Sequence, residues 1–526
     1  MSWRQLNSLN LLHWSCQNEK PALAPATPYD CEGAFTGCLD TSLRQKDSSA
    51  PLVAFYSSVK HLPFKWNEPY PRGAAGISIA WSVFGQKYKN NPILNAEPVS
   101  LEVTGFRDPF VARWPTLTAL LGDSNETRYA LVAGGIRGKG PTAFLYRVSG
   151  MLGESWTYLN TLIDVSSNFR PHHKWSGDYG VNFECASFIT LRSCSRDRVW
   201  DNRKQIVLAG TEGGHEKSWQ QQSPRTIRSC LWMVGHLSVD TDGSPKFCRE
   251  YCGLLDHGCW YAASPFHDPV ADSTLVWGWI PEEDAPPDYH RIKGWNGCLG
   301  LLRELFILVI PNVCGTTFSS LDDLSCIGRT QESAESWTVE TLGIRPAPVL
   351  DLLHKETLGR LCQLSLPNAH DSHRNIATAS KTWELQADVA LTAGCAEVGV
   401  VIHHSDEVCH KTRIYFSPRY EEIVVERHAS NQDPTIDKSD DRGSHTLFVT
   451  YDPKLSERST ESLQLRIFRD GDVLEVFAND RFALATLVYS KEEASEGVSV
   501  YAIGKAESAQ FSYVHLHSLQ LEKLDS

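Results

Sequence analysis

The chain has 526 residues, and its 63 Asp and Glu residues outnumber its 50 Lys and Arg residues, which gives a formal net charge of −13 at pH 7. This length exceeds what one hydrophobic core normally serves, so at least two domains are expected. The basic residues are scattered and outnumbered, which argues against a nucleic-acid partner. No apolar run approaches the roughly 20 residues that cross a bilayer, so we expect no membrane partner and favour a neutral ligand.

The sequence gives no sign of a metal site or cofactor. Its 15 Cys residues form no repeating frame and no C-x-x-C pair, so neither a zinc site nor a disulfide scaffold is expected. His172-His173 and His403-His404 lack a Cys or carboxylate frame, and we expect both pairs in surface loops. The opening Met1-Ser2-Trp3-Arg4 has no basic segment followed by an apolar one, so no secretory signal is expected in the chain as written. The oligomeric state is left open.

From about residue 30 to 310, short apolar runs alternate with clusters of Gly, Pro, Asn and Asp. Residues 129–133 before Gly134 and residues 206–209 before Gly210 are examples. This pattern predicts short strands in an antiparallel, all-β domain, and no long amphipathic helix alternates with them. Periodicity alone does not separate a propeller from a sandwich or a barrel.

A change of character between about residues 315 and 370 indicates a domain connection. A Ser-rich loop is followed by a Pro-containing segment and by the helix-capable stretch Val349 to Leu361. Beyond it, Leu463, Leu465 and Ile467 alternate with polar residues before a turn at Asp470-Gly471, which is typical of a half-buried antiparallel sheet. We therefore expect a first domain over 1–345, a linker over 346–369 and a β-sandwich over 370–526.

Two carboxylates stand beside aromatic residues: Asp108 in Phe106-Arg107-Asp108-Pro109-Phe110 and Glu184 in Asn182-Phe183-Glu184-Cys185. Glycoside hydrolysis uses such a pair, one as proton donor and one facing the oxocarbenium-like transition state. Apolar neighbours should raise the pKa of Glu184 and suit it to general acid catalysis, whereas Arg107 should keep Asp108 ionised to accept sugar hydroxyls. Taken singly, Arg-Asp-Pro is also a common turn, and Glu184 could be a surface strand residue.

Further segments, in this order, strengthen the pattern. They are Trp3 through Trp14, Pro21 through Pro25, Gly33 through Cys38, Leu255 through Ala262, Trp277 through Ile280, Gly294 through Leu305, and Val473 through Asp480. Together with the two acidic motifs, they resemble glycoside hydrolase family 32, the β-fructofuranosidases, with likeness to fungal members and over nearly the whole chain.

The resemblance implies a five-bladed β-propeller, with its first blade incomplete here, followed by a C-terminal β-sandwich. It implies that Glu184 is the acid/base and that Asp108 stabilises the transition state by binding fructose hydroxyls. Arg107, Phe35 and Thr36 would bind substrate, which would be sucrose, inulin or levan. It also suggests that a full-length form is secreted or vacuolar, and no cofactor is implied.

Members of this family are retaining enzymes whose nucleophile is an Asp in an Asn-Asp-Pro-like motif before the segment that Trp3 begins here. Asp30 and Asp40 lack the flanking residues of that motif, so we assign neither as the nucleophile. We expect impaired activity in the chain as written. Either the sequence begins at an internal methionine of a longer enzyme, which we favour, or the protein is shortened and inactive.

Other functions stay open on the sequence alone. The family's third motif often continues Glu-Cys-Pro-Asp, whereas here Glu184-Cys185 is followed by Ala186-Ser187, which leaves the substrate preference open. Hydrolysis and fructosyl transfer share one intermediate, so a fructosyltransferase is an alternative. A non-catalytic fructan-binding protein is another. A related five-bladed family that acts on arabinose or xylose polymers fits residues 33–38 and 277–279 less well.

Overall fold

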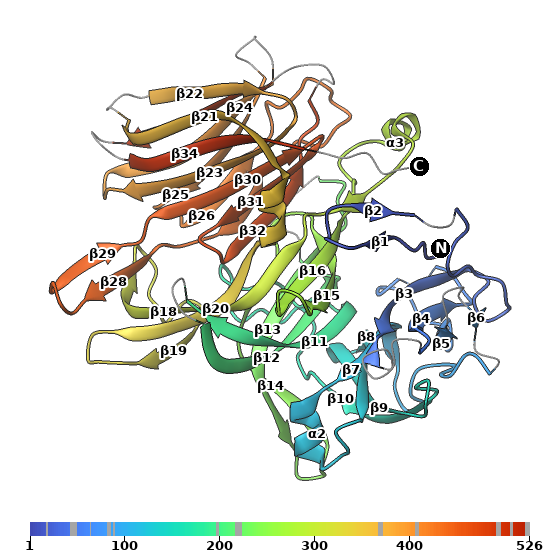
Figure 1. Cartoon of the computed structure of the whole chain (residues 1–526). Helices are drawn as coiled ribbons and strands as arrows, with labels where there is room; N and C mark the ends of the chain where they lie inside the picture. Colours follow the sequence, from blue (N-terminus) through green and yellow to red (C-terminus); the bar gives the residue numbers. More distant parts are fainter. Residues whose placement is uncertain are drawn as a thin grey trace.

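The computed structural model describes residues 1–526 except 17–18, 43–49, 64, 82–85, 88–89, 196–198, 216–222, 367–371, 405–409, 491–495, 505–508 and 521–526. In Figure 1, the strands of the N-terminal part lie at the lower centre and right, and the two six-stranded sheets of the C-terminal part pack face to face at the upper left. Strands dominate both parts and helices are short. The all-β prediction is confirmed.

Three smaller N-terminal sheets are antiparallel, and within each the strands follow one another in chain order. A two-stranded sheet comprises β1 (Asn7–Ser8) and β2 (Trp14–Ser15). One four-stranded sheet comprises β3 (Gly33–Asp40), β4 (Val53–Val59), β5 (Ala75–Trp81) and β6 (Gln86–Lys87). The next comprises β7 (Val103–Arg113), β8 (Arg128–Ile136), β9 (Gly140–Ser149) and β10 (Ser155–Thr161), with helix α2 (Pro115–Leu121) between β7 and β8. The strand predicted before Gly134 is confirmed as β8.

Two further groups of strands belong to a larger sheet. The first is β11 (Asn182–Cys194), β12 (Val199–Glu212), β13 (Arg228–Val239) and β14 (Pro245–Leu254). The second is β15 (Tyr261–Asp268), β16 (Ser273–Ile280), β17 (Cys298–Leu299), β18 (Arg303–Thr316), β19 (Gly328–Gln331) and β20 (Trp337–Pro346), with helix α3 (Pro287–Lys293) after β16. Strands β3, β7, β11 and β15 contact one another in that order, which brings the first strand of each group to a common centre.

The C-terminal part is a sandwich of two six-stranded sheets. One contains β21 (His354–Ser365), β34 (Ala509–Leu519), β23 (Thr382–Leu391), β30 (Leu463–Asp470), β31 (Val473–Ala478) and β32 (Phe482–Leu487). The other contains β22 (Ser372–Ala379), β33 (Glu496–Gly504), β24 (Cys395–His403), β25 (Lys411–Ser417), β26 (Glu422–Glu426) and β27 (Asp441–Ser444). The predicted alternation holds, because Leu463, Leu465 and Ile467 are buried between the sheets. The predicted hairpin joins β30 to β31.

The helix expected over residues 349–361 is wrong. A short 3-10 helix, η2 (Pro348–Leu353), is followed directly by strand β21. Strand β21 pairs with β34, and two irregularities, at His354/Glu356 and Thr357/Gly359, interrupt its register. Part of the stretch expected to be a linker therefore already belongs to a sandwich sheet, while the domain boundaries at 345 and 369 stay a prediction.

The sandwich also contributes to the large sheet of the N-terminal part. Strand β28 (Phe448–Asp452) pairs with β18 and with β29 (Glu457–Thr460), and the hairpin projects from the sandwich beside β18 and β19 in Figure 1. Between the two parts, Arg303 of β18 is fully buried. It donates to Glu475 of the sandwich at 2.7 Å and lies 2.9 Å from Asp256. Backbone pairing and a buried ion pair thus join the two parts.

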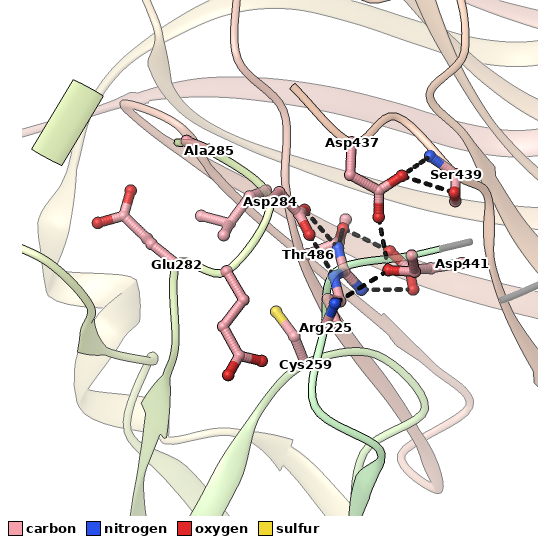
Figure 2. Close-up of polar contacts among 12 residues, drawn as sticks. Arg225, Cys259, Glu282, Asp284, Ala285, Asp437, Ser439, Asp441 and Thr486 are labelled. Atoms are coloured by element: carbon pink, nitrogen blue, oxygen red, sulfur yellow. Dashed lines mark hydrogen bonds and ion pairs between the residues drawn. The ribbon is translucent and has the colours of Figure 1, made fainter. Parts of the chain in front are cut away.

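A second buried polar cluster crosses the same interface (Figure 2). Arg225 of the N-terminal part binds Asp284 through Nε and Nη2, and donates from Nη1 to Asp441 of the sandwich at 2.8 Å. Arg427 of the sandwich reaches back to the same Asp284 at 2.7 Å. Although burial opposes ionisation, the two guanidinium groups lower the pKa of Asp284 to about 2. The Asp284 carboxylate stays ionised because an arginine from each part of the chain compensates its negative charge.

The expected surface location of the second His pair is wrong for His404. His404 is 3% exposed, and its ring nitrogens lie 3.0 Å from Glu496 and 2.8 Å from the Thr412 hydroxyl. His403 is the last residue of β24. A glutamate distant in sequence therefore provides a carboxylate partner that local spacing did not reveal.

None of the described helices combines the length and apolar character that a membrane crossing requires.

Candidate functional site

The central strands share a local irregularity at the candidate site. The register shifts between Ala34 and Gly37 in β3, Arg107 and Phe110 in β7, Glu184 and Ser187 in β11, and Tyr261 and Ser264 in β15. Three of these shifts contain a non-glycine residue with positive φ: Asp108 (60°), Cys185 (49°) and Ala262 (57°). Such bulges redirect side chains away from the regular ladder. The sequence motifs around Asp108 and Glu184 therefore lie at corresponding positions of neighbouring strand groups.

Arg107 is the centre of the site. Its Nη2 donates to Glu184 Oε1 at 2.7 Å and to Glu212 Oε2 at 2.6 Å, and its Nε donates to Glu184 Oε1 at 3.1 Å. Its Nε lies 4.0 Å from Asp108 Oδ2. Gly105 leaves space for this arrangement, because a Cβ there would lie 2.6 Å from Arg107 Nη1. One buried guanidinium thus holds three carboxylates around itself.

Asp108 is 5% exposed and is positioned by backbone contacts on both sides. Its N–H donates to Ser57 Oγ at 2.7 Å, and its Oδ2 accepts the N–H of Cys185 at 3.1 Å. The second bond joins Asp108 to the residue that follows Glu184, so the two predicted catalytic residues come together across β7 and β11. The pair predicted from sequence faces one common centre.

Glu184 is held from the opposite side by Tyr261 of β15. The Tyr261 hydroxyl donates to Glu184 Oε2 at 2.7 Å. A Cβ at Gly210 would lie 2.7 Å from the Tyr261 hydroxyl, so glycine at this point of β12 leaves room for the phenol. The side chains of Glu184 and Glu212 are each 22% exposed. Their carboxylates are ordered by the protein and still reach solvent.

The pKa values of the three carboxylates are shifted in different directions. Burial raises the pKa of Asp108 to about 6, and the negative charge of Glu184 adds to the rise. Burial also acts to raise the pKa of Glu184, but the ion pair with Arg107 and the hydrogen bonds from Arg107 and Tyr261 outweigh it and lower that pKa. Burial and the charge of Glu184 raise the pKa of Glu212. The expected order, with Glu184 raised and Asp108 readily ionised, is therefore wrong for this structure.

The raised pKa of Asp108 predicts a pH-dependent contribution to stability. The unfolded chain has an Asp pKa of about 3.9, so the stabilisation is fully present below about pH 4 and is lost as the pH rises through about 6. We expect the free energy of unfolding, relative to Asp108→Asn, to fall by on the order of 3 kcal/mol over this range. Chemical denaturation of both proteins between about pH 3.5 and 7.5 measures the difference. A difference that is constant with pH would contradict the assignment.

The predicted substrate residues Phe35 and Thr36 lie at the bulge of β3. Ser57 Oγ, which accepts the N–H of Asp108, donates to the Thr36 carbonyl at 3.1 Å. The Trp3 indole donates to the Phe35 carbonyl at 2.9 Å. Phe35 is partly buried and Thr36 is exposed. This bulge is thus coupled through Ser57 to Asp108, and a role in the fructose pocket stays a prediction.

Asp30 and Asp40 are engaged in structural contacts. Asp30 is buried and accepts hydrogen bonds from Ala26 N, Thr27 N and the Thr27 hydroxyl. Asp40 accepts a hydrogen bond from Arg128 at 2.6 Å. These contacts hold both carboxylates in the local structure, and that neither is the nucleophile stays a prediction.

Three polar residues of the site were not assigned a role from the sequence: Glu212, Tyr261 and Asn182. Asn182 Nδ2 donates to Glu212 Oε2 at 2.8 Å, and Thr104 Oγ1 donates to Asn182 Oδ1 at 3.0 Å. The pairing of Asn182 with Glu212 across β11 and β12 places them together. The only signal for Glu212 was its position between an apolar strand and Gly213-Gly214, which is too common to assign chemistry.

Among the described residues, Asp351, His354 and Glu384 form a group with ligand atoms within 4.8 Å of one another. Arg466 already donates to Glu384 and to Asp351, at 2.6 Å in both cases. A guanidinium at this position supplies the positive charge that the carboxylates require, so the group is explained as an ion-pair network of the sandwich.

Comparison with known proteins places this geometry in a family. The chain is 23% identical over 316 residues to a fructan 1-exohydrolase of Hordeum vulgare and 24% identical over 309 residues to fructan 1-exohydrolase w3 of Triticum aestivum. These matches cover 58% of this chain and 45% of each relative, so the chain spans less than half the length of the curated relatives it matches.

Solved structures match over a greater length. A β-fructofuranosidase of Aspergillus kawachii, complexed with glycerol, is 27% identical with a TM-score of 0.85, over 99% of this chain and 88% of that chain. A fructosyltransferase of A. japonicus shares the fold at 23% identity and a TM-score of 0.85, over 99% and 90%. The model for the N-terminal domain of glycosyl hydrolases family 32 matches residues 1–312, and that for the family's C-terminal domain matches 356–518. With this fold and both domain matches, the chain belongs to glycosyl hydrolase family 32.

Proposed function

We propose that this protein acts on β-fructofuranosidic bonds, and that its full-length form hydrolyses sucrose, inulin or levan by a retaining mechanism. The observation that carries the proposal is the convergence of Asp108, Glu184 and Glu212 on the guanidinium of Arg107. Family membership supports the reaction class, and the names of the relatives support a sugar substrate.

In this proposal, Glu184 protonates the departing glycosyl oxygen. Its contact with Arg107 lowers its pKa in the structure, so a substrate that draws Arg107 toward its hydroxyls would raise that pKa toward the range of a general acid. Asp108 accepts hydrogen bonds from fructose hydroxyls and stabilises positive charge at the anomeric carbon. Both roles require the ionised form of Asp108. Tyr261 keeps the Glu184 carboxylate oriented.

A retaining mechanism also requires a nucleophile about 5 to 5.5 Å from the acid/base. The resemblance places this Asp in a segment ahead of Trp3, and the contacts of Asp30 and Asp40 offer no replacement. We propose that neither Asp30 nor Asp40 is that nucleophile. Fructosyl transfer is the alternative outcome of the same intermediate, decided by whether water or a second sugar attacks it.

The test is hydrolysis of sucrose, inulin and levan by the full-length form, with arabinan as the comparison substrate. We expect release of fructose from at least one fructose-containing substrate and no release of arabinose. Product analysis at high sucrose concentration separates free fructose from lengthened oligosaccharides. Cleavage of arabinan alone would overturn the proposal, and fructan binding without any turnover would support a non-catalytic sugar-binding protein instead.

A further inference from the structure

Ser57 of β4 lies opposite the bulge of β3. The pairing of these two strands skips Phe35 and Thr36 on β3 and Ser57 on β4. On its other side, Ser57 pairs regularly with Ile77 of β5, and the residue is fully buried. The regular pairing with β5 therefore fixes the position from which the Ser57 hydroxyl reaches the bulge.

The Ser57 hydroxyl bridges the bulges of two neighbouring strand groups. Its Oγ donates to the Thr36 carbonyl of β3 at 3.1 Å and accepts the N–H of Asp108 of β7 at 2.7 Å. A hydroxyl has one hydrogen to donate, and the Thr36 carbonyl takes it, so the amide of Asp108 is the donor in the second bond. One buried oxygen thus satisfies a backbone group on each of the two bulges.

Asp108 depends on such contacts because its backbone has φ 60°. A non-glycine residue keeps a conformation of this kind where its surroundings fix it. Ser57 holds the amide of Asp108, and the N–H of Cys185 binds its Oδ2 at 3.1 Å. Without the Ser57 hydroxyl, the buried amide would lack an acceptor, and the bulge would turn to find another. The carboxylate of Asp108 would move with it.

We propose that Ser57 is a positioning residue: it ties the bulges of β3 and β7 together and so holds the Asp108 carboxylate at the anomeric carbon of the fructose unit. This inference rests on the proposed function. The same contact aligns Asp108 with the fructose pocket predicted at Phe35 and Thr36. Ser57 itself does not touch the substrate, because it is fully buried and both of its partners are backbone groups.

Ser58 provides the matched control. It is the next residue of β4, is 1% exposed, and its Oγ accepts the hydroxyl of the buried Ser78 at 2.8 Å. Ser78 belongs to β5, so this bond stays inside the sheet and does not involve Asp108. Replacement of either serine by Ala deletes a buried hydrogen bond of the same strand, and only the change at Ser57 reaches the site.

The first test is steady-state kinetics of the full-length form with sucrose and inulin. We expect Ser57→Ala to lower kcat/KM about 100-fold, the effect of a misplacement of about 1 Å. The loss should lie mainly in kcat and be equal on both substrates, because Asp108 acts on the fructose unit that they share. Ser57→Thr keeps the hydroxyl and should restore most of the loss, and Ser57→Cys should lie between the two. Ser58→Ala should keep the kcat/KM of the parent.

The second test needs no turnover. Relative to Asp108→Asn, the free energy of unfolding of the parent should fall as the pH rises to about 6, the pKa of Asp108. Burial raises this pKa and the N–H of Cys185 lowers it. A bulge that turns away from Cys185 therefore raises the pKa further, and in the Ser57→Ala background the fall should extend to higher pH. Urea denaturation between about pH 4 and 8, in the parent, Ser57→Ala and Ser58→Ala backgrounds, measures the shift.

Two outcomes would overturn the role of Ser57 while leaving the proposed function in place. One is a folded Ser57→Ala variant with the kcat/KM of the parent and an unshifted pH dependence. The other is an equal loss of kcat/KM in Ser57→Ala and Ser58→Ala, because both losses would then reflect the strand alone. Absence of fructose release by the parent would instead overturn the proposed function, and the pH dependence of unfolding would still decide whether Ser57 positions Asp108.

Discussion

Replacement of Glu184 by Gln in the full-length form should lower kcat on sucrose or inulin by at least about 1000-fold, because the amide cannot donate the proton that the leaving oxygen requires. The amide still fits beside Arg107 and Tyr261, whose hydrogen bonds hold the carboxylate. We therefore expect a folded protein that still binds substrate. Initial-rate kinetics, together with thermal unfolding of parent and variant, measure the two effects separately.

Glu250→Gln is a suitable control for this variant, because Glu250 lies on β14 with its side chain 44% exposed and pairs with His236. Its kcat should match that of the parent. Substrates with a low leaving-group pKa sharpen the experiment. An activated aryl fructoside needs little protonation in the first step, so Glu184→Gln should lose much less kcat/KM on it than on sucrose. Full activity of Glu184→Gln on sucrose would refute the acid/base assignment.

Replacement of Arg225 by Met should destabilise the protein by about 3 to 5 kcal/mol, the usual cost of leaving buried charges without their partner. Asp284 and Asp441 would both lose a guanidinium that contacts them directly, in the cluster of Figure 2. Because the pKa of Asp284 is lowered to about 2, its stabilisation is present above about pH 4 and disappears as the pH falls toward 2. The difference in the free energy of unfolding between parent and variant should therefore be largest at neutral pH and smallest in acid.

Urea denaturation of parent and variant measures this effect, with Arg291→Met as the control. Arg291 pairs with Asp288 on α3, and the two side chains are 77% and 82% exposed. An exposed pair of this kind contributes at most about 1 kcal/mol. Equal stability losses in the two variants would show that the buried cluster does not hold the two parts of the chain together.

Sequence reasoning located the two central acidic residues, and local rules explain why. Arg107-Asp108-Pro109 and Glu184-Cys185 interrupt strands, and the structure places a register shift at each. The order of their pKa values could not be predicted. Adjacency in sequence suggested that Arg107 neutralises Asp108, but the backbone at Asp108 has φ 60°, and the guanidinium turns to Glu184 and Glu212. Glu212 and Tyr261 come from other strands, and no local pattern marks them.

Tertiary pairing also explains the wrong helix. Leu358, Leu361 and Leu364 recur every third residue, a spacing that a helix would use, and all three pack against the sandwich core. The register shift between Thr357 and Gly359 and the positive φ of Gln363 (51°) change which residues face inward, so a strand satisfies the same spacing. Pairing with β34 supplies the backbone hydrogen bonds that decide between the two conformations, and this partner is about 150 residues away in the chain.

The repeated bulges on β3, β7, β11 and β15 separate scaffold from chemistry. Strand pairing on either side of each shift preserves the sheets. The bulged residue does not pair, so its side chain need not follow the alternation between the two faces of the sheet. Substitutions at those positions can change the site without repacking the strand groups, so each group can vary at the site independently of the others.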